Sequence, residues 1–203
     1  HMAAFIRWFN DSLKTFTPLA RAGIAHLYSV SIHPYEDGNG RMARALVEKA
    51  LSQSLKAPAL SGLSNQIAAK KSSYYDALAR NNQDLEITDW LLYFGKTLIS
   101  AKKYVLASVE NVLRKSAIYR KFAKELNERQ IKAIDRLFEA EPDGFIGGLS
   151  AGKYITITKA PRATATRDLQ KLAHLGILHK TGELRHTRYW LSTSQNTLPA
   201  EYP

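Results

Sequence analysis

The chain has 203 residues, 45% of them hydrophobic, and a formal net charge of +11 at pH 7. This length and composition predict a folded protein of one large or two small domains and exclude a disordered chain. No apolar run approaches the roughly 18 residues of a membrane span and no secretory signal is present, so we expect no membrane partner. The absence of cysteine excludes disulfides and thiolate metal sites and is consistent with a cytoplasmic location. The positive charge favours an anionic partner such as a nucleotide, a nucleic acid or an acidic protein surface.

Hydrophobic periodicity predicts helices through almost all of the first 127 residues. Residues 3–14 form an amphipathic pattern, and Thr17-Pro18 is typical of an N-cap followed by proline at the first helical position. The helix that this pair begins is expected to end near Val30. Further helices are expected over residues 42–55, over about 62–82, and from Thr88-Asp89 to about Arg114.

The composition changes near Asn127, and the rest of the chain predicts a different architecture. A helix from Glu128 to Ala140 is followed by short segments and then by a helix over about 161–175. Glycines at 176 and 182 and the β-prone segment 187–191 predict a hairpin at the end. Helices followed by a two-stranded wing are typical of a winged helix-turn-helix. The expected fold is therefore mostly α, a helical bundle followed by a small α+β winged helix-turn-helix domain, with the boundary at 120–128.

The segment 31–44 holds the densest group of chemically useful residues in the sequence. In Gly38-Asn39-Gly40, the glycines permit positive φ angles and a close backbone approach, so successive amide N–H groups can converge on an anion. A helix that begins near Arg41 adds its own free N–H groups and the positive end of its dipole. Arg41 and Arg44 share one face of that helix and can hold phosphate oxygens with forked donors. Asn39 can also donate to phosphate, so the segment predicts an anion site.

Two further residues suggest what is done with the anion. Asp37 precedes the glycine turn, and a carboxylate beside a polyphosphate is favourable only with a cation between them, which suggests Mg²⁺. His33 lies four residues upstream, where an imidazole can deprotonate a hydroxyl that attacks a phosphoryl group. The predicted reaction class is phosphoryl or nucleotidyl transfer.

Each of these features also has an ordinary structural explanation. Asp-Gly and Asn-Gly are common turn dipeptides, and a His-Pro pair often only starts a loop. No Walker A pattern and no kinase glycine loop occurs here. The combination with two arginines on one face of an apolar-faced helix favours the functional explanation.

Residues 33–44 resemble the signature of the Fic family, His-x-Phe-x-Asp/Glu-Gly-Asn-Gly-Arg-x-x-Arg. The match holds at every specified position except Tyr35, where the family usually has Phe; we expect this aromatic position to be buried. The resemblance extends over roughly residues 3–105, including the segments 21–26 and 84–90. It implies a Fic-type helical bundle as a catalytic core over residues 1–122, with the winged-helix domain over 123–203.

The resemblance implies an enzyme that transfers AMP from ATP to a tyrosine, threonine or serine hydroxyl of a target protein. His33 would then be the general base, Asp37 the Mg²⁺ ligand, and Gly38, Asn39 and Gly40 the anion hole, with Arg41 and Arg44 holding phosphates. Tyr74, Tyr75 and Asn82 are similar to positions that line the adenine pocket, although such residues at helical spacing are as often partly buried surface. His26, on an apolar helix, is expected to be a core residue.

Two features of the family are missing from the sequence. The inhibitory motif Ser/Thr-x-x-x-Glu-Gly/Asn does not occur, and residues 15–32 are predicted to be helical where a target-docking flap would be needed. We therefore expect the catalytic core to be truncated at its N-terminus.

The segment 160–172 resembles the recognition helix of a winged helix. Leucines at 169, 172 and 175 can face the core, while Arg162, Thr164, Arg167 and Lys171 stay outside as candidate DNA contacts. Residues 150–190 contain eight Lys or Arg and two Asp or Glu, a net charge of +6, which suits contact with phosphates. Winged helices also dock proteins or mediate dimers, and a basic face is often only solvated, so DNA and protein partners both remain open.

Three functions follow from these observations. The leading hypothesis is a protein adenylyltransferase that uses Mg²⁺ and ATP. The rival is a DNA-binding transcriptional regulator, whose Fic core senses a nucleotide without turnover. The third is a Fic-type phosphotransferase, or a relative with another donor. A homodimer is compatible with all three.

Overall fold

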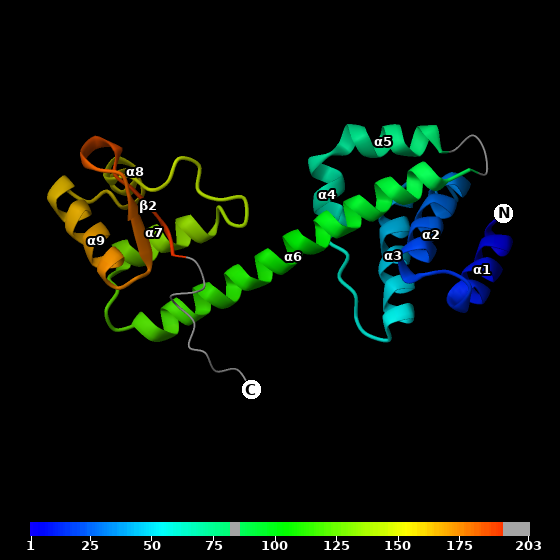
Figure 1. Cartoon of the computed structure of the whole chain (residues 1–203), viewed down its shortest axis with the longest axis horizontal. Helices are drawn as coiled ribbons and strands as arrows, with labels where there is room; N and C mark the ends of the chain where they lie inside the picture. The colour runs from blue at the N-terminus through cyan, green and yellow to red at the C-terminus, as the bar shows by residue number, and fades with distance from the viewer. Residues whose placement is uncertain (82–85, 193–203) are drawn as a thin grey trace. The chain divides into compact units, whose positions relative to one another are not determined.

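The computed structural model describes residues 1–81 and 86–192, and helices dominate these residues (Figure 1). This confirms the predicted mostly α fold class. The chain divides into two compact units between Val105 and Leu106, inside helix α6 (Thr88–Phe122). The boundary predicted at 120–128 lies further along the chain than this division, near the end of the helix. Within the described ranges, none of the helices combines the length and the apolar character that crossing a bilayer requires.

The described residues of the first unit form helices joined by loops and contain no strand. Its elements are α1 (Met2–Asp11), a 3-10 turn η1 (Ser12–Lys14), α2 (Pro18–Ile32), α3 (Asn39–Leu55), α4 (Leu63–Ala69), α5 (Lys71–Arg80) and the first part of α6. The predicted cap of α2 is confirmed, because the Thr17 side chain accepts a hydrogen bond from the Ala20 amide at 3.3 Å. The two helices that flank the predicted anion turn, α2 and α3, pack directly against each other.

Between residues 62 and 122, two predictions of helix extent are wrong. The helix expected over 62–82 is two helices that break at Lys70, whose φ and ψ of −129° and 46° are not helical. The four residues 70–73 are all exposed, so nothing apolar holds this turn against the core. α6 continues eight residues beyond the predicted end at Arg114, to Phe122. It does so because Ile118 and Phe122 are buried in the core of the second unit.

One buried cation connects the helices of the first unit. Arg21 on α2 is 1% exposed and donates only to uncharged oxygens. Its guanidinium reaches the Phe9 carbonyl at 2.6 Å, the Ser12 hydroxyl at 3.1 Å, the Gln53 side chain at 2.9 Å and the Ala50 carbonyl at 3.2 Å. It also lies over the Phe9 ring, 4.4 Å from the centroid. Arg21 thereby connects α1, η1 and α3 to α2.

Helix α6 is fixed to α2 by a close contact at Gly23. A Cβ at this residue would lie 2.9 Å from Leu91 Cδ2 and 3.0 Å from Phe94 Cδ1. The Gly23 carbonyl accepts a 2.8 Å hydrogen bond from the indole of the fully buried Trp90. The small size of glycine is therefore what lets the two helices approach so closely.

The described residues of the second unit place the end of α6 and three further helices around a core that a short hairpin closes. Its elements are the end of α6, α7 (Glu128–Phe138), α8 (Ala151–Thr158), α9 (Arg162–His174), β1 (Leu178–Thr181), a 3-10 turn η2 (Leu184–His186) and β2 (Arg188–Leu191). The strands are antiparallel, with Leu178 opposite Leu191 and Thr181 opposite Arg188, which confirms the predicted hairpin. An isolated bridge joins Leu149 to Tyr189.

Helix α8 lies where the sequence predicted only short segments. The Ser150 side chain caps it by accepting a 3.2 Å bond from the Lys153 amide, and Tyr154 anchors it in the core. Its second half, Ile155-Thr156-Ile157-Thr158, is entirely β-branched. β-branched residues have low helix propensity, so tertiary packing decides the helical conformation here.

We expect Arg21→Met to destabilise the first unit by about 2–3 kcal/mol, because it removes four buried hydrogen bonds that join α2 to its neighbours. Urea unfolding followed by circular dichroism measures this change. Arg7→Met on the exposed side of α1 is the matched control and should stay within about 0.5 kcal/mol of wild type. Equal stability of the Arg21 and Arg7 variants would contradict a linking role for Arg21.

Candidate functional site

The candidate site lies on the loop between α2 and α3, and a left-handed residue stands at each end of it. His33 ends α2 with φ 48° and ψ 58°, and its amide donates to the Ser29 carbonyl at 3.3 Å. Gly38 precedes α3 with φ 86°. Such angles end one helix and redirect the chain into the next, and they leave the His33 side chain exposed.

Helix α3 begins at Asn39, earlier than predicted, so the glycine turn itself forms the start of the helix. The first backbone hydrogen bond of the helix runs from the Met42 amide to the Gly38 carbonyl at 2.9 Å. The amides of Asn39, Gly40 and Arg41 precede this bond and have no acceptor within the helix. A helix start of this kind binds anions through its amides and its dipole.

The Asn39 side chain holds the loop together. Its oxygen accepts the Tyr35 amide at 3.0 Å, and its nitrogen donates to the Tyr35 carbonyl at 2.6 Å. Asn39 itself is buried and its side chain is used by these two bonds, so the predicted anion contact of this residue would be made by its backbone amide. The Tyr35 ring is 49% exposed, and the expected burial of this aromatic position is therefore wrong. The clamp fixes the Tyr35 backbone and leaves its ring outside.

Both arginines of the segment lie at the start of α3. A Cβ on residue 38 would lie 3.4 Å from Arg41 Nη2, and one on residue 40 would lie 3.3 Å from Arg44 Nη1. Each guanidinium therefore occupies space that a larger residue in the glycine turn would need. Arg41 also pairs with Asp37 at 2.8 Å, and the two side chains are 74% and 90% exposed. The structure thus brings Asp37, Gly38, Gly40, Arg41 and Arg44 together.

The donor chemistry at Asp37 fits Mg²⁺ that arrives with a phosphate ligand. Asp37 offers one exposed carboxylate, and the described residues contain no cluster of three His, Cys, Asp or Glu side chains. Magnesium commonly binds through one or two carboxylates together with substrate phosphates and water.

The residues predicted for the nucleobase are in different environments. Tyr74 is buried, with its hydroxyl 2.9 Å from His26 Nε2, whereas Tyr75 is 56% exposed. The two tyrosine rings meet edge to face at 5.3 Å. Asn82 lies outside the described residues.

His26 is buried, as expected, and stacks on Trp90 with ring centroids 5.5 Å apart. Burial lowers its pKa to about 4, and the charge of Arg44 acts in the same direction. Burial also raises the pKa of Tyr74 to about 12. The pair is therefore neutral at pH 7 and connects α2 to α5 behind the site.

A comparison with known protein families finds a match to the part of the chain that contains the loop between α2 and α3. Residues 1–51 match the Fic/DOC family. The matched range includes the whole segment from His33 to Arg44, all of α2 and all but the last four residues of α3.

Named relatives resemble this Fic/DOC-like region over limited lengths. Protein adenylyltransferase fic-1 of Caenorhabditis elegans is 46% identical over 50 residues, 24% of this chain and 10% of that protein. Its Caenorhabditis briggsae counterpart is 43% identical over 54 residues, 26% of this chain and 11% of the relative. Protein adenylyltransferase Fic of Drosophila melanogaster is 35% identical over 83 residues, 40% of this chain and 16% of the relative. The matched part of this chain thus spans between about a tenth and a sixth of these relatives.

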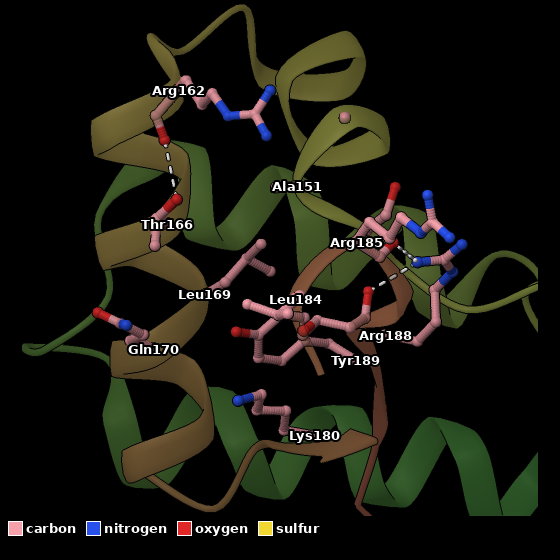
Figure 2. A pocket seen from close by; sticks show the side chains of 13 residues that line it. Ala151, Arg162, Thr166, Leu169, Gln170, Lys180, Leu184, Arg185, Arg188 and Tyr189 are labelled. Atoms are coloured by element: carbon pink, nitrogen blue, oxygen red, sulfur yellow. Dashed lines mark hydrogen bonds between the residues drawn. The ribbon is translucent and has the colours of Figure 1, made fainter. Parts of the chain in front are cut away.

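The second unit contains a cationic hollow of about 610 Å³ between α9 and the hairpin (Figure 2). Arg162 is the one predicted DNA contact among its lining residues. Thr166 and Gln170 also line it from α9, although sequence analysis did not select them. The spacing 162, 166 and 170 could have identified them, because residues four apart share a helix face.

The other predicted DNA contacts lie elsewhere on α9. Thr164 and Arg167 line a second hollow of about 480 Å³ that also contains Arg129. The Lys171 ammonium donates to the Glu125 carbonyl just after α6. The structure therefore does not bring the four predicted residues together on one surface.

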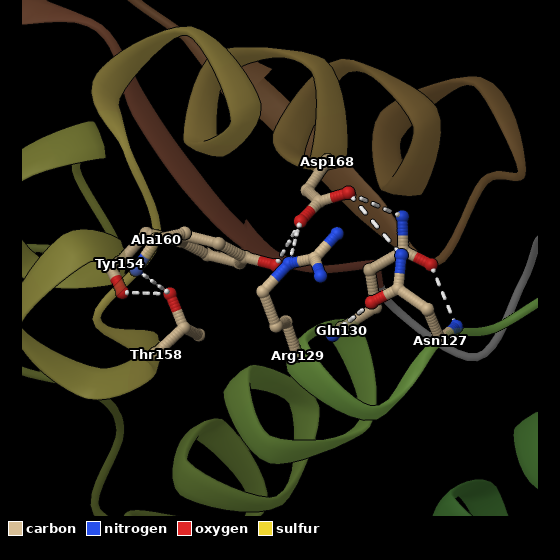
Figure 3. A network of polar contacts seen from close by, with 7 residues as sticks. All are labelled: Asn127, Arg129, Gln130, Tyr154, Thr158, Ala160 and Asp168. Atoms are coloured by element: carbon tan, nitrogen blue, oxygen red, sulfur yellow. Dashed lines mark hydrogen bonds and ion pairs between the residues drawn. The ribbon is translucent and has the colours of Figure 1, made fainter.

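Asp168 fixes the rotation of helix α9 about its own axis (Figure 3). This buried carboxylate accepts hydrogen bonds at 2.9 Å from the Tyr154 hydroxyl, 3.1 Å from Arg129 Nε, 3.2 Å from Gln130 Nε2 and 3.3 Å from Asn127 Nδ2. These donors come from α7 and its cap and from α8. One side chain of α9 is thus held by both neighbouring helices.

We expect Asn39→Ala to loosen the loop, because it removes both hydrogen bonds to the Tyr35 backbone. Amide hydrogen exchange at Tyr35 should accelerate by about tenfold or more, and stability should fall by about 1–2 kcal/mol. Asn65→Ala, an exposed asparagine of α4, is the control and should change neither quantity. Unchanged exchange at Tyr35 in the Asn39 variant would contradict the clamp.

His26 predicts a pH dependence of stability. Its folded-state pKa, about 4, lies below the ordinary value of 6.5, so the unfolded state binds its proton first as pH falls. The stabilisation is complete above about pH 6.5 and is lost toward pH 4, a change of about 3 kcal/mol. In His26→Phe, the fall in stability between pH 7 and pH 4 should be smaller by that amount in urea unfolding.

The exposed His179 provides the control for this pH dependence. His179→Phe should retain the full fall in stability between pH 7 and pH 4. If the His26 and His179 variants lose stability equally with acid, His26 is not neutral in the fold.

Proposed function

We propose that the chain carries a protein adenylyltransferase site, which transfers AMP from Mg-ATP to a serine, threonine or tyrosine hydroxyl of a target protein. The observation that carries this proposal is the start of α3, where the amides of the glycine turn lie beside Arg41 and Arg44 in a region that matches the Fic/DOC family. The relatives named as protein adenylyltransferases support an adenylyl group as the group transferred and a protein as the acceptor.

The proposed reaction uses residues between His33 and Arg44, which lie on the loop between α2 and α3 and on the helix ends beside it. The amides of Gly38, Asn39 and Gly40 and the two guanidinium groups bind the phosphates and offset charge that develops on their oxygens. His33, exposed at the end of α2, takes the proton from the target hydroxyl. The hydroxyl oxygen forms a bond to the α-phosphorus, the bond to the bridging oxygen of the β-phosphate breaks, and pyrophosphate leaves.

Asp37 would hold the Mg²⁺ ion, which when bound screens the charge of the phosphates. The pairing of Asp37 with Arg41 at 2.8 Å supports this role, because two side chains so close together can act on one phosphate ligand. For the nucleobase, we propose stacking on the exposed ring of Tyr75. Tyr74 supports that ring from the core, and Asn82 stays a prediction.

For the second unit, we propose a winged helix-turn-helix. The order α7, the Leu149 bridge, α8, α9 and the β1–β2 hairpin supports this assignment. The rival function, a nucleotide-sensing DNA-binding regulator, would place its DNA contacts here. That function and the phosphotransferase stay predictions, as do a cytoplasmic location and a homodimer.

Incubation with Mg²⁺ and ATP labelled at the α-phosphate tests the proposed reaction, with the chain itself and a cell extract as acceptors. We expect label on protein, and a loss of about 100-fold or more in rate in His33→Ala, because general bases contribute at least that much. His179→Ala, another exposed histidine, should label like wild type.

Two outcomes would contradict adenylyl transfer. Label that appears only from ATP marked at the γ-phosphate would indicate a phosphotransferase. Binding of Mg-ATP in calorimetry, without transfer in any acceptor mixture, would favour the nucleotide-sensing regulator.

A further inference from the structure

The cationic hollow of the second unit is built from two walls and an apolar floor. One wall is α9, the other is the hairpin with its turn η2, and Leu169 and Tyr189 lie between them (Figure 2). The N-terminal end of α8, with the Ser150 cap, also borders the hollow. At about 610 Å³, the space is large enough for a segment of a charged polymer and is open to solvent.

The charge of the hollow is uncompensated. Four cations line it, Arg162, Lys180, Arg185 and Arg188, and none of the described lining residues is an aspartate or glutamate. Arg188 donates to the carbonyls of Arg185 at 3.2 Å and Thr187 at 2.8 Å, and so takes no carboxylate as a partner. The ion pairs found among the described residues involve none of these four side chains.

The α9 wall presents side chains that can recognise bases. Arg162, Thr166 and Gln170 are exposed and follow one another at intervals of four, so they form one row along the helix. Guanidinium and carboxamide groups can each pair with a base edge through two hydrogen bonds, and a threonine methyl can contact thymine. The row faces the hollow between the helix and the basic hairpin.

The opposite side of α9 makes its hydrogen bonds within the second unit. Asp168 accepts four hydrogen bonds from α7, its cap and α8, and Lys171 is tied to the Glu125 carbonyl. These contacts hold the helix at one rotation, in which the row 162, 166 and 170 faces outward. The recognition surface is therefore preorganised.

We propose that this hollow binds double-stranded DNA, with Lys180, Arg185 and Arg188 on phosphates and Arg162, Thr166 and Gln170 toward the major groove. A helix row next to a basic hairpin fits a duplex better than it fits an acidic peptide, because the helix can enter the groove while the hairpin follows the backbone. This assignment goes beyond adenylyl transfer. It also replaces the contact set Thr164, Arg167 and Lys171 with residues of the hairpin and a different face of α9.

Fluorescence anisotropy of the whole chain with a labelled random-sequence duplex tests the phosphate contacts over a series of salt concentrations. The double variant Lys180→Ala/Arg185→Ala should weaken binding by roughly tenfold for each lost contact at about 0.1 M salt. It should also lower the slope of log affinity against log salt by about 2. The matched control is Lys132→Ala/Arg136→Ala, which removes two exposed charges from α7 of the same unit and should leave the slope unchanged.

Selection from a randomised duplex pool tests the α9 row. Gln170→Ala should lose the sequence preference of the wild type at one position with little change in salt slope, whereas Arg167→Ala should keep that preference. Circular dichroism and thermal melts establish that each variant is folded before its binding is compared.

Three results of the duplex-binding experiments would overturn the proposal. They are absence of duplex binding at about 50 mM salt, equal weakening by the hollow and control variants, or loss of sequence preference in Arg167→Ala but not in Gln170→Ala. Binding of polyglutamate, an acidic polypeptide, tests whether the hollow recognises an acidic protein instead of DNA. If it binds as tightly as the duplex and with the same dependence on Lys180 and Arg185, the hollow is an acidic-protein site and not a DNA site.

Discussion

The arrangement of the first unit depends on Arg21, a guanidinium buried without a carboxylate among its described partners. A charge removed from water is tolerated only if its donors are satisfied, and here neutral oxygens from α1, η1 and α3 satisfy them. All of these elements must therefore be in place together. Arg21 lies near the start of α2, and its acceptors Ala50 and Gln53 lie near the end of α3, so these contacts hold the two helices together at one pair of ends. The loop with His33 and the glycine turn joins the other pair of ends.

Two neutral side chains, His26 and Tyr74, connect α2 to α5 in the first unit. His26 and Tyr74 are hydrogen-bonded and buried behind Arg44, and burial keeps both uncharged at pH 7. Arg44 therefore has no buried anion on that side among these neighbours, so its charge stays available to an external phosphate. In the second unit the charges are arranged in the opposite way. There a buried carboxylate, Asp168, is surrounded by donors, and the cations are left at the surface.

Periodicity and local motifs predicted most of the helices and the residues of the candidate site, because those signals come from neighbours in the sequence. The Thr17-Pro18 cap and the hairpin were predicted for that reason. The predictions that were wrong concern features that depend on contacts between residues far apart in the sequence. Helix α8 is held by Tyr154 against its own β-branched sequence, the end of α6 is set by Ile118 and Phe122, and the exposure of Tyr35 follows from the clamp by Asn39. The rotation of α9 could not be predicted either, since Asp168 fixes it through donors about 40 residues earlier.

At the loop, the exposed carboxylate of Asp37 is the counter-ion of the Arg41 guanidinium. An incoming phosphate competes with Asp37 for Arg41, and under the proposed role of Asp37 a divalent cation competes with Arg41 for Asp37. Each ligand therefore releases the partner that the other needs, so the two should bind with positive thermodynamic coupling. Exposed pairs contribute about 0–1 kcal/mol, which limits this part of the coupling to a factor of about five. Nucleotide affinity would then rise gradually with the concentration of the cation, without a threshold.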